Sequence, residues 1–257
     1  MKKKISIITI VKNDEWGILK TIDAVDRQKI DKNLIEHVIV YSKSKDNTLK
    51  NIKSYKANFR KVIFQKKKGI YDALNEGIKH CVGKYVIILH SGDIYYNNKI
   101  LNNLNKNFIN KDFDIIFSSL AIVDFKKKKV FRNYKIRKIS NFLLRCGWMP
   151  PHEGMMIKKD IIRKHSYYTL KYKIASDFDF LIKVLFNNKY YKIGYNNNIS
   201  VLMNNEGISS QWKNKFLIFQ EISLILKENK IFTLKFFQIF RYFIRMNEIF
   251  FKQKIKV

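Results

Sequence analysis

The stretch KYVIILHSGD, residues 84–93, begins as an apolar run and ends in one glycine and one carboxylate. A continuous run rich in β-branched residues is typical of a strand that is buried on both faces. We therefore predict a strand over residues 84–90, with Asp93 lying just beyond its carboxyl end. The flanking sequence indicates why a chain this rich in lysine has a lone acid at this position.

Upstream, strand-like and helix-like segments alternate. Strands are predicted at 4–11, 36–42 and 61–65, and helices at 15–28, 48–56 and 70–81. Short connections between alternating strands and helices favour a parallel sheet with helices on both faces. In such sheets ligands bind beyond the carboxyl ends of the strands, which is where Asp93 is expected.

Downstream of about residue 110 the regular alternation of strands and helices ends. A strand is predicted over 113–125, followed by a basic hairpin around KKKKV, residues 126–130. A helix is expected at 175–186, then two short strands at 190–194 and 198–203, and long apolar-basic helices from about residue 210. We divide the chain into a domain at 1–210 and a C-terminal amphipathic helical segment at 211–257.

Composition sets wide bounds on function. The chain has 257 residues, 46% of them hydrophobic, which is enough for a sizeable core. The formal net charge of +30 attracts anions such as nucleic acid, anionic lipid and phosphorylated small molecules. Lysine, asparagine and isoleucine are all abundant, as a codon bias toward A and T would produce, so the charge indicates no single partner.

Cysteine usage and the absence of apolar export signals point to the cytoplasm. Cys81 and Cys146 make no disulfide framework and match no zinc spacing, which suits a reducing compartment. The apolar run after MKKK is too short for a signal peptide and is followed at once by KNDE. No charge-free apolar stretch of roughly 20 residues occurs, so no membrane-spanning helix is expected.

Six short segments, in this order and spacing, carry a family likeness: SIITIVKN, SKSKDNT, KGIYDALNEGI, GKYVIILHSGD, PPHEG and IASDFDF. From residue 4 to about 210 the chain resembles the inverting family-2 glycosyltransferases of bacterial surface-polysaccharide type. The resemblance implies an α/β fold of GT-A type, a mostly parallel sheet flanked by helices, here with a C-terminal helical extension. It also implies a nucleotide-sugar donor, Mn²⁺ or Mg²⁺, and transfer to a hydroxyl of a glycan or lipid-linked acceptor.

The resemblance assigns roles residue by residue. Asp93 matches the final aspartate of the family's metal-binding motif, whose other acidic position is Gly92 here, and Asp177 matches the catalytic base. His152 is a second candidate metal ligand. The candidate donor-binding residues are Thr9, Asn13, Tyr41, Asp46, Lys68, Gly69, Asp72, Asn75, Ser91 and Gly92.

The chemistry of the reaction supports the acidic assignments independently. A sugar diphosphate leaves as a highly charged anion, and Mg²⁺ or Mn²⁺ is commonly held by one or two carboxylates plus phosphates. The acceptor hydroxyl loses its proton as it attacks, and a positioned carboxylate such as Asp177 can take that proton. Attack opposite the leaving group would invert the anomeric centre.

Structural interpretations stay open beside these roles. Asp93 could cap a following helix, and Asp177 could be a first-turn acid favoured by the helix dipole. Asp179 competes for the role of base, and His152 could be an ordinary loop residue. Asp46 suits a turn or cap close to the nucleotide. The other histidines show no metal spacing and are expected to be structural or solvated: His37, His80, His90 and His165.

The chain departs from the family pattern on the nucleotide half of the site. Tyr41 stands where an aspartate usually accepts a hydrogen bond from the base, and Ser42 and Lys43 replace the glycines that follow. Lys67 replaces an acid, while Ile10 and Lys12 replace a proline and a tyrosine. Either the donor is unusual, with Lys12, Lys43 and Lys67 gripping phosphate, or the donor site has decayed.

Residues 231–257 are unusually aromatic. On a helix, Lys235, Gln238, Arg241, Arg245 and Glu248 form one polar stripe. The helix could lie in a membrane interface, with basic residues drawn to anionic lipid. It could equally pack onto the domain or a second copy of the chain. Acceptors in the family are often lipid-linked sugars, which favours peripheral contact with the inner membrane face.

Two other classes of function remain open. The chain could be a non-catalytic relative that serves as a binding or scaffold subunit, although Asp93 and Asp177 favour an active enzyme. A nucleic-acid-binding protein is permitted by the charge. We find no zinc finger, RNA-stacking motif or recognition helix, so no nucleic acid is expected.

Overall fold

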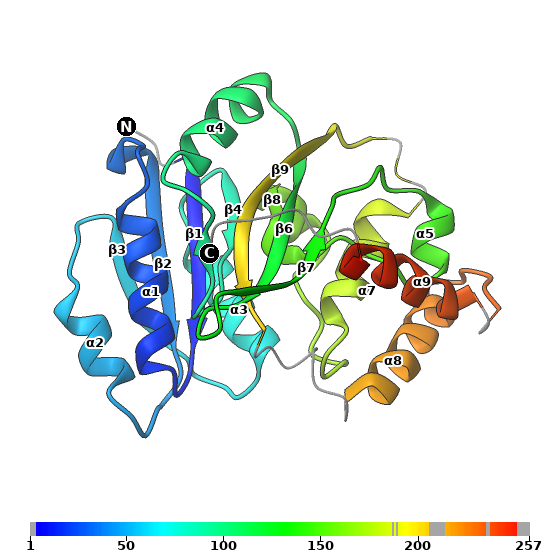
Figure 1. Ribbon diagram of the computed structural model, residues 1–257, viewed down its shortest axis with the longest axis horizontal. Coiled ribbons are helices and arrows are strands. Elements are labelled where there is room, and N and C mark those ends of the chain that lie inside the picture. The colour runs from blue at the N-terminus through cyan, green and yellow to red at the C-terminus, as the bar shows by residue number, and fades with distance from the viewer. Residues whose placement is uncertain (1–3, 187, 189, 206–213, 235–236, 251–257) are drawn as a thin grey trace.

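One mixed β-sheet runs through the molecule (Figure 1). The computed structural model describes residues 4–186, 188, 190–205, 214–234 and 237–250. The strands are β1 (Ile5–Val11), β2 (Ile35–Tyr41), β3 (Arg60–Phe64), β4 (Tyr85–Ile88), β5 (Ile94–Tyr95), β6 (Ile115–Asp124), β7 (Lys129–Tyr134), β8 (Met155–Lys158) and β9 (Ile193–Asn204). Their order across the sheet is β3-β2-β1-β4-β8-β6-β9-β5, with β7 paired to the outer part of β6.

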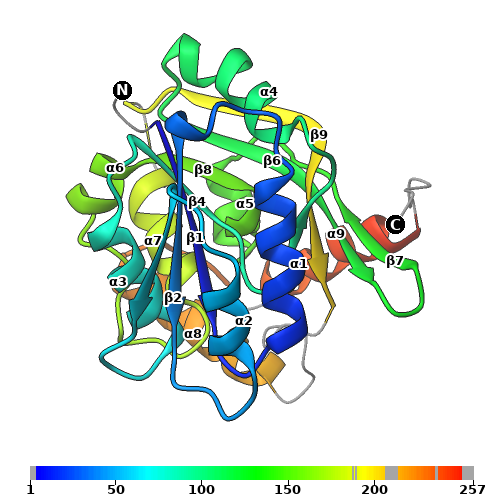
Figure 2. The ribbon, with the colours of Figure 1, turned by 90° about the vertical axis from the view of Figure 1, so that its left-hand side faces the viewer.

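Helices cover both faces of this sheet. They are α1 (Glu15–Asp26), α2 (Thr48–Ser54), α3 (Ile70–His80), α4 (Ile100–Asn107), α5 (Asn141–Arg145), α6 (Lys159–Lys164), α7 (Ser176–Leu185), α8 (Lys215–Glu228) and α9 (Phe237–Phe250). Figure 2 shows α1 and α4 on one face and α3, α6 and α7 on the other. The C-terminal helices α8 and α9 lie with α5 and α7 at the right-hand end of Figure 1.

The predicted parallel half of the sheet is confirmed. Strands β3, β2, β1 and β4 all run parallel, in register from Ile5 opposite Ile35 to Val11 opposite Tyr41. Their apolar runs serve both faces: Ile7 packs in the cluster with α4, whereas Ile8 packs in the cluster with α3. Double-sided burial explains why these strands read as continuous apolar runs.

The second half of the sheet departs from a simple parallel order. The four-residue strand β8 lies between β4 and β6 and runs antiparallel to both. Strand β6 is therefore parallel to β4, and so is β9, which pairs with β6 in parallel. The carboxyl ends of β1, β2, β3, β4, β6 and β9 consequently meet at one edge, and β8 begins at that same edge.

One element was predicted wrongly. The two short strands expected at 190–194 and 198–203 are a single strand, β9 (Ile193–Asn204). The strand continues through the polar run Asn196-Asn197-Asn198 with a register shift opposite Ser118 and Ser119. A bulge of this kind inserts residues without ending the strand. The predicted strand at 113–125 and its basic hairpin are confirmed as β6 and β7.

Helix α9 packs onto the domain with its polar stripe facing inward. Gln238, Arg241 and Glu248 are almost fully buried, while Phe240, Phe243 and Met246 are about half exposed. It packs mainly against β7 and α5, and Gln238 also contacts Ser223 of α8. Lys235 lies outside the described residues, and the side chain of Arg245 is not described. No helix in the described ranges combines the length and apolar character needed to cross a membrane.

The proposed boundary at residue 210 stays a prediction. Helix α8, beyond that boundary, packs against α7 and contributes Ile222, Ile225 and Leu226 to the larger apolar core.

The buried His37 of β2 forms side-chain hydrogen bonds to the neighbouring strands β1 and β3. The His37 Nε2 atom lies 2.9 Å from Thr9 Oγ1, and its Nδ1 atom accepts a hydrogen bond from Arg60 Nε at 3.2 Å. Burial, assisted by the Arg60 charge, lowers the pKa of His37 well below its usual value. In the folded protein His37 is therefore neutral at pH values where an unfolded histidine takes up a proton.

We expect this difference to make the protein acid-sensitive. Below a pH of about 6.5 the unfolded chain binds a proton that folded His37 does not, so the free energy of unfolding falls by up to about 1.4 kcal/mol per pH unit. Urea unfolding of wild type and His37→Gln between about pH 7 and about pH 5 should show a shallower decline in the variant. The exposed His80→Gln is the control. Equal pH dependence in all three proteins would contradict the assignment of a neutral His37.

Candidate active site

Two sequence motifs far apart in the chain meet at the carboxyl edge of the sheet. The HSGD turn, His90–Asp93, follows β4, and the PPHEG segment ends in the 3₁₀ turn His152–Gly154 that leads into β8. Because β8 is antiparallel to β4, with Ile87 opposite Met156, the start of β8 lies beside the end of β4.

The HSGD turn is held rigidly. Gly92 has φ +92°, a left-handed conformation that favours glycine, and its N–H donates to Thr21 Oγ1 at 3.0 Å. The Asp93 N–H donates to the His90 carbonyl, and Asp93 Oδ1 accepts the N–H of Asn204 at 2.9 Å. Strand β5 follows Asp93 at once, so the alternative that Asp93 caps a helix is wrong.

Three side chains converge next to this turn. His90 Nε2 lies 2.9 Å from His152 Nε2, and Glu153 Oε1 lies 3.8 Å from the first nitrogen and 3.5 Å from the second. Among the described residues these form a group of potential ligands whose atoms all lie within 4.8 Å of one another. The site residues His90 and His152 thus lie together, whereas His90 was expected to be structural or solvated.

Asp177 reaches the same cluster from the first turn of α7. Its Oδ2 atom lies 3.3 Å from His152 Nδ1, and its Oδ1 atom accepts the Phe178 N–H at 2.8 Å. The Tyr71 hydroxyl lies 3.3 Å from Oδ1 and also bonds the Ile174 carbonyl. The competing acid, Asp179, is buried on the other side of the turn and pairs with Lys183 at 2.6 Å.

Charges in the cluster shift the pKa values of its members. Burial, then the charge of His152, lowers the pKa of His90 to about 4. Burial alone would lower the pKa of His152, but Glu153 and Asp177 outweigh it and raise that pKa to about 9. Burial and the Glu153 charge raise the pKa of Asp93 well above its usual value. Glu153 and Asp177 therefore stabilise a positive charge on His152.

The candidate donor residues fall into two groups. Thr9 is fully buried, with its hydroxyl donating to the Leu89 carbonyl, and both amide atoms of Asn75 bond the backbone of Tyr168. The others lie in or next to the loops that follow β1, β2, β3 and β4: Asn13, Tyr41, Asp46, Lys68, Gly69, Asp72, Ser91 and Gly92.

Hydrogen bonds join three of these loops. Asn13 Oδ1 accepts the Lys45 N–H at 2.8 Å, and the Ser91 hydroxyl donates to Asp14 Oδ2 at 2.6 Å. The Tyr41 side chain is buried, and its hydroxyl accepts the Ser44 N–H at 3.0 Å. Asp46 accepts backbone N–H groups of Glu15 and Thr48, as expected for a turn and cap residue.

A residue from the C-terminal helices supports the segment that carries Asp177. The buried Glu221 carboxylate of α8 accepts the backbone N–H groups of Lys173, Ile174 and Ala175 at 2.8, 3.0 and 2.9 Å. These three residues immediately precede α7. Helix α8 therefore fixes the path of the chain into the turn where Asp177 lies.

Sequence reasoning missed His90, Glu153, Tyr71 and Glu221 as site residues. Both His90 and Glu153 stand inside quoted motifs, yet no local spacing relates His90 to the PPHEG segment, whose His152 is 62 positions further along the chain. Nothing in the sequence around Glu221 marks it, because its three partners are backbone groups on another segment.

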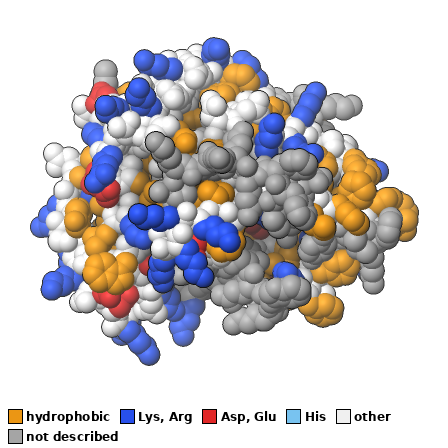
Figure 3. Space-filling model, viewed as in Figure 1, with side chains coloured by type: hydrophobic (Ala, Val, Ile, Leu, Met, Phe, Trp, Pro, Cys, Tyr) orange, Lys and Arg blue, Asp and Glu red, His pale blue; other side chains and the backbone are white. Residues whose placement is uncertain are grey.

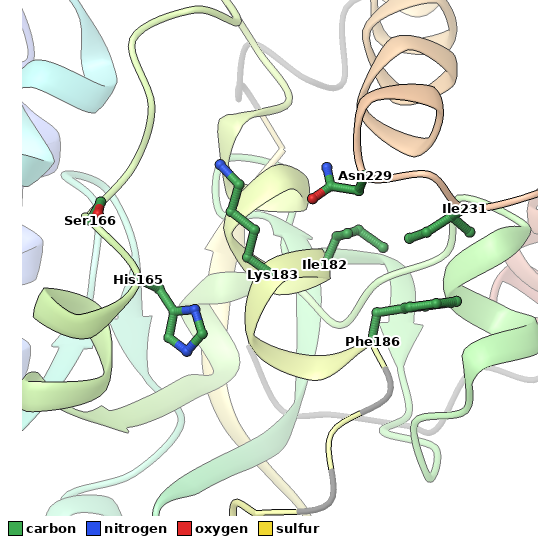
Figure 4. A pocket seen from close by; sticks show the side chains of 7 residues that line it. All are labelled: His165, Ser166, Ile182, Lys183, Phe186, Asn229 and Ile231. Atoms are coloured by element: carbon green, nitrogen blue, oxygen red, sulfur yellow. The ribbon is translucent and has the colours of Figure 1, made fainter.

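The described structure also has a pocket of about 490 Å³ away from this cluster. Figure 4 shows its lining, which comes mainly from α7 and from the segments that follow α6 and α8. None of the candidate site residues lines it.

Comparison with known proteins identifies the family to which the chain belongs. A model of glycosyl transferase family 2 matches residues 6–172, more than half of the chain. The chain belongs to glycosyl transferase family 2. The uncharacterized glycosyltransferase Rv1514c of Mycobacterium tuberculosis is 24% identical over 184 residues, 70% of this chain and 68% of the relative.

Solved structures establish the fold as GT-A. S. aureus TarS 1-349 in complex with UDP-GlcNAc has a TM-score of 0.69 at 17% identity, over 87% of this chain and 66% of that one. The chain spans 39% of the longer TarS chain. Glucosyl-3-phosphoglycerate synthase from M. tuberculosis, in complex with Mn²⁺, UDP and phosphoglyceric acid, has a TM-score of 0.59 at 15% identity, over 89% of this chain and 79% of that one.

Glu221 offers a test of how α8 supports the site. Glu221→Gln keeps the shape but removes the charge that accepts three N–H groups, so it should lower the free energy of unfolding by about 2 kcal/mol. Glu228→Gln is the control on the same helix, because Glu228 is exposed, pairs with Lys171 and accepts the Tyr172 hydroxyl at 2.7 Å, a bond that the glutamine oxygen can keep. This variant should lose clearly less stability than Glu221→Gln, because exposed ion pairs contribute little. Equal urea midpoints for the two variants would contradict the structural role of Glu221.

Proposed function

We propose that this chain is a metal-dependent, inverting hexosyltransferase that moves a sugar from a nucleotide-sugar donor to a hydroxyl of a glycan or lipid-linked acceptor. The cellular role that we propose is cell-surface polysaccharide synthesis. The observation that carries the proposal is the meeting of Asp177 with the HSGD turn, through His152, at the carboxyl edge of the sheet. Family membership and the TarS structure with UDP-GlcNAc support the donor class.

Asp177 is the base in this proposal. Its carboxylate is oriented by the Phe178 N–H and the Tyr71 hydroxyl on one oxygen and by His152 on the other. The acceptor hydroxyl gives its proton to Asp177 while its oxygen bonds the anomeric carbon. The electron pair of the broken bond leaves with the nucleoside diphosphate, and attack from the opposite face inverts the anomeric centre.

A divalent ion, Mn²⁺ or Mg²⁺, fits the residues beside Asp177. Asp93 and His152 would hold it, since Asp93 is buried in the turn that follows β4 and His152 contacts His90 of that same turn. Such an ion neutralises the charge that develops on the departing diphosphate. The structure of glucosyl-3-phosphoglycerate synthase with Mn²⁺ and UDP supports a divalent ion in this fold.

Phosphate contacts rather than a base-specific contact would dominate donor binding. Tyr41 stands where the family usually has an aspartate, so this position offers no carboxylate to a nucleotide base. Its hydroxyl instead accepts the Ser44 N–H. Exposed lysines follow β1, β2 and β3 at the same edge, among them Lys12, Lys43 and Lys67. Lysine and arginine side chains lie at the lower left and lower centre of Figure 3, the side toward which β1 points in Figure 1, and also along the upper edge. This arrangement supports weak discrimination between nucleotide bases.

Asp177→Asn tests the proposed chemistry. The substitution is nearly isosteric but removes the base, so sugar transfer should fall by about 10²–10⁴-fold. Donor affinity should survive, because Asp177 is assigned to the acceptor side. Both are measured with a panel of nucleotide sugars, with and without Mn²⁺.

Asp179→Asn is the matched control two residues along the same helix. Asp179 pairs with Lys183 and has no contact with His152 among the described interactions, so this variant should lose stability more than transfer. Loss of transfer in Asp179→Asn alone would make Asp179 the base. Normal transfer by both variants would refute the proposed mechanism.

The orientation of α9 supports peripheral membrane contact. The buried stripe is held by specific partners: Gln238 Nε2 donates to Ser223 Oγ at 2.7 Å, and Glu248 lies 3.5 Å from Arg132 Nε. The aromatic side of the helix consequently faces outward. Orange side chains gather at the right-hand end of Figure 3, where α5, α8 and α9 lie in Figure 1.

These outward side chains form one apolar face, defined here by Phe142, Phe232, Leu234, Phe240, Phe243 and Met246. The Phe142 ring contacts Phe240, which contacts Phe243. Exposed cations lie next to it in the chain, namely Arg145, Lys227 and Lys230. Aromatic residues bordered by cations suit the surface of an anionic bilayer, and we place the enzyme in the cytoplasm on the inner membrane face.

Replacing the centre of the apolar face tests this placement. The double variant Phe240→Ser/Phe243→Ser should stay folded and lose co-sedimentation with vesicles of phosphatidylcholine and phosphatidylserine. Tyr190→Ser, at a highly exposed aromatic residue outside the face, should bind as wild type does. If wild type instead forms a homo-oligomer that the double variant abolishes, and neither binds vesicles, the face joins two copies of the chain.

A further inference from the structure

We propose that the pocket of about 490 Å³ shown in Figure 4 binds a phosphate ester of an apolar alcohol. This chemistry is shared by the headgroup of an anionic lipid and by a soluble alkyl phosphate. The pocket lies away from the cluster around His152, so its ligand is separate from the donor and the ion of the proposed reaction.

Two kinds of side chain line different sides of the pocket. Ser166 and Lys183 lie toward the left of Figure 4, whereas Ile182, Phe186 and Ile231 gather at the right. A volume of about 490 Å³ is within the range of small-molecule sites. A ligand that fits both sides has a polar head and an apolar body.

Donor groups on the polar side remain available to such a head. The Lys183 ammonium carries three N–H groups, and its bond among the described residues goes to Asp179 Oδ2 at 2.6 Å. The Lys183 side chain is 42% exposed. The Ser166 hydroxyl is exposed and bonds none of the described residues. Ammonium and hydroxyl groups are donors that phosphate oxygens accept strongly.

The electrostatic potential around the polar side is positive. Burial, then the charges of Lys164 and Lys183, lowers the pKa of His165, which lines the pocket. Asp179 balances Lys183, whereas Lys164 and Lys230 have no acidic partner among the described residues. Lys230 stands between two residues of the pocket lining. These charges favour an anionic head over a neutral one.

The apolar side of the pocket continues into the apolar face. Ile231 lines the pocket and immediately precedes Phe232 of that face, which is 76% exposed. The Phe186 ring lies 5.6 Å from the Arg145 guanidinium carbon, and the Arg145 carbonyl accepts the Thr233 hydroxyl. An apolar chain whose phosphate lies in the pocket therefore has exposed apolar surface next to it, which free phosphate does not use.

The pocket is preformed, because three helices hold its walls. His165 ends α6, and its Nε2 atom lies 2.9 Å from the Tyr191 hydroxyl. Lys183 belongs to α7. Asn229 caps the end of α8, with its Nδ2 donating to the Ile225 carbonyl at 2.8 Å. A preformed site loses less free energy to the ordering of side chains when a ligand binds.

The test measures binding to the full chain without donor or metal. Octyl phosphate is titrated below its critical micelle concentration by calorimetry, and isotope-labelled isoleucine methyl groups report by NMR where it binds. Inorganic phosphate tests the anion alone, and octyl glucoside tests the apolar chain alone. We expect one octyl phosphate per chain, shifts at Ile182 and Ile231, and binding of the other two compounds weaker by about tenfold or more.

Two substitutions at Ser166 separate charge from shape. Ser166→Glu adds a carboxylate to the polar side and should weaken octyl phosphate binding by about tenfold or more, whereas Ser166→Gln should bind within about threefold of wild type. Lys183→Gln should also weaken binding, and Lys183→Arg should restore it. Because Lys183 pairs with the buried Asp179, the two Ser166 variants decide the result if Lys183→Gln does not fold.

Vesicles of phosphatidylcholine and phosphatidic acid distinguish the two sources of the ester. Weaker co-sedimentation of Ser166→Glu, but not of Ser166→Gln, supports a bilayer lipid as the ligand. If both variants bind vesicles as wild type does while Ser166→Glu loses octyl phosphate, a bilayer source is refuted and the ligand is a soluble ester.

Other outcomes overturn the pocket as a phosphate-ester site, whatever a transferase assay shows. These are equal octyl phosphate binding by the two Ser166 variants, isoleucine shifts confined to residues outside the pocket, or inorganic phosphate binding as tightly as octyl phosphate. Octyl phosphate binding that Ser166→Glu weakens, in a protein that transfers no sugar, leaves the pocket standing and refutes the transferase.

Discussion

The antiparallel pairing of β8 with β4 is the constraint on which the site depends. A parallel strand at that position would begin at the opposite edge of the sheet, and the segment before it would lie far from the HSGD turn. The pairing of Ile87 with Met156 instead places His152 and Glu153 beside His90 and Asp93. Each half of the cluster is anchored to a buried strand, so its geometry is set by backbone hydrogen bonds.

The C-terminal helices contribute to the site rather than only covering the core. Glu221 of α8 binds the three N–H groups that precede α7 and so supports the turn that carries Asp177. The buried polar side chains of α9 in turn contact Ser223 of α8 and Arg132 of β7. A buried polar stripe needs partners in fixed positions, and that requirement is what turns the aromatic side of α9 to the outside.

Hydrogen bonds organise the loops at the carboxyl edge of the sheet. The Tyr41 hydroxyl accepts the Ser44 N–H and so holds the loop after β2. Asn13 and Ser91 join that loop to those after β1 and β4. Side-chain hydrogen bonds thus connect the loops after β1, β2 and β4 to one another.

The sequence by itself determined the parallel half of the fold and the positions of Asp93 and Asp177. Apolar periodicity and turn residues are local signals, and they locate strands and the residues at their ends. Only the tertiary structure decided which residues join them. His90 and His152 are 62 positions apart, and their contact depends on the register of β8 against β4. The structure also distinguishes the two acids of α7 by their burial: 15% of the Asp177 side chain is exposed, against 4% for Asp179. The sequence does not show which of two acids on one helical turn is the more exposed. The direction in which α9 faces was decided by its partners Ser223 and Arg132, which lie on other elements of the chain.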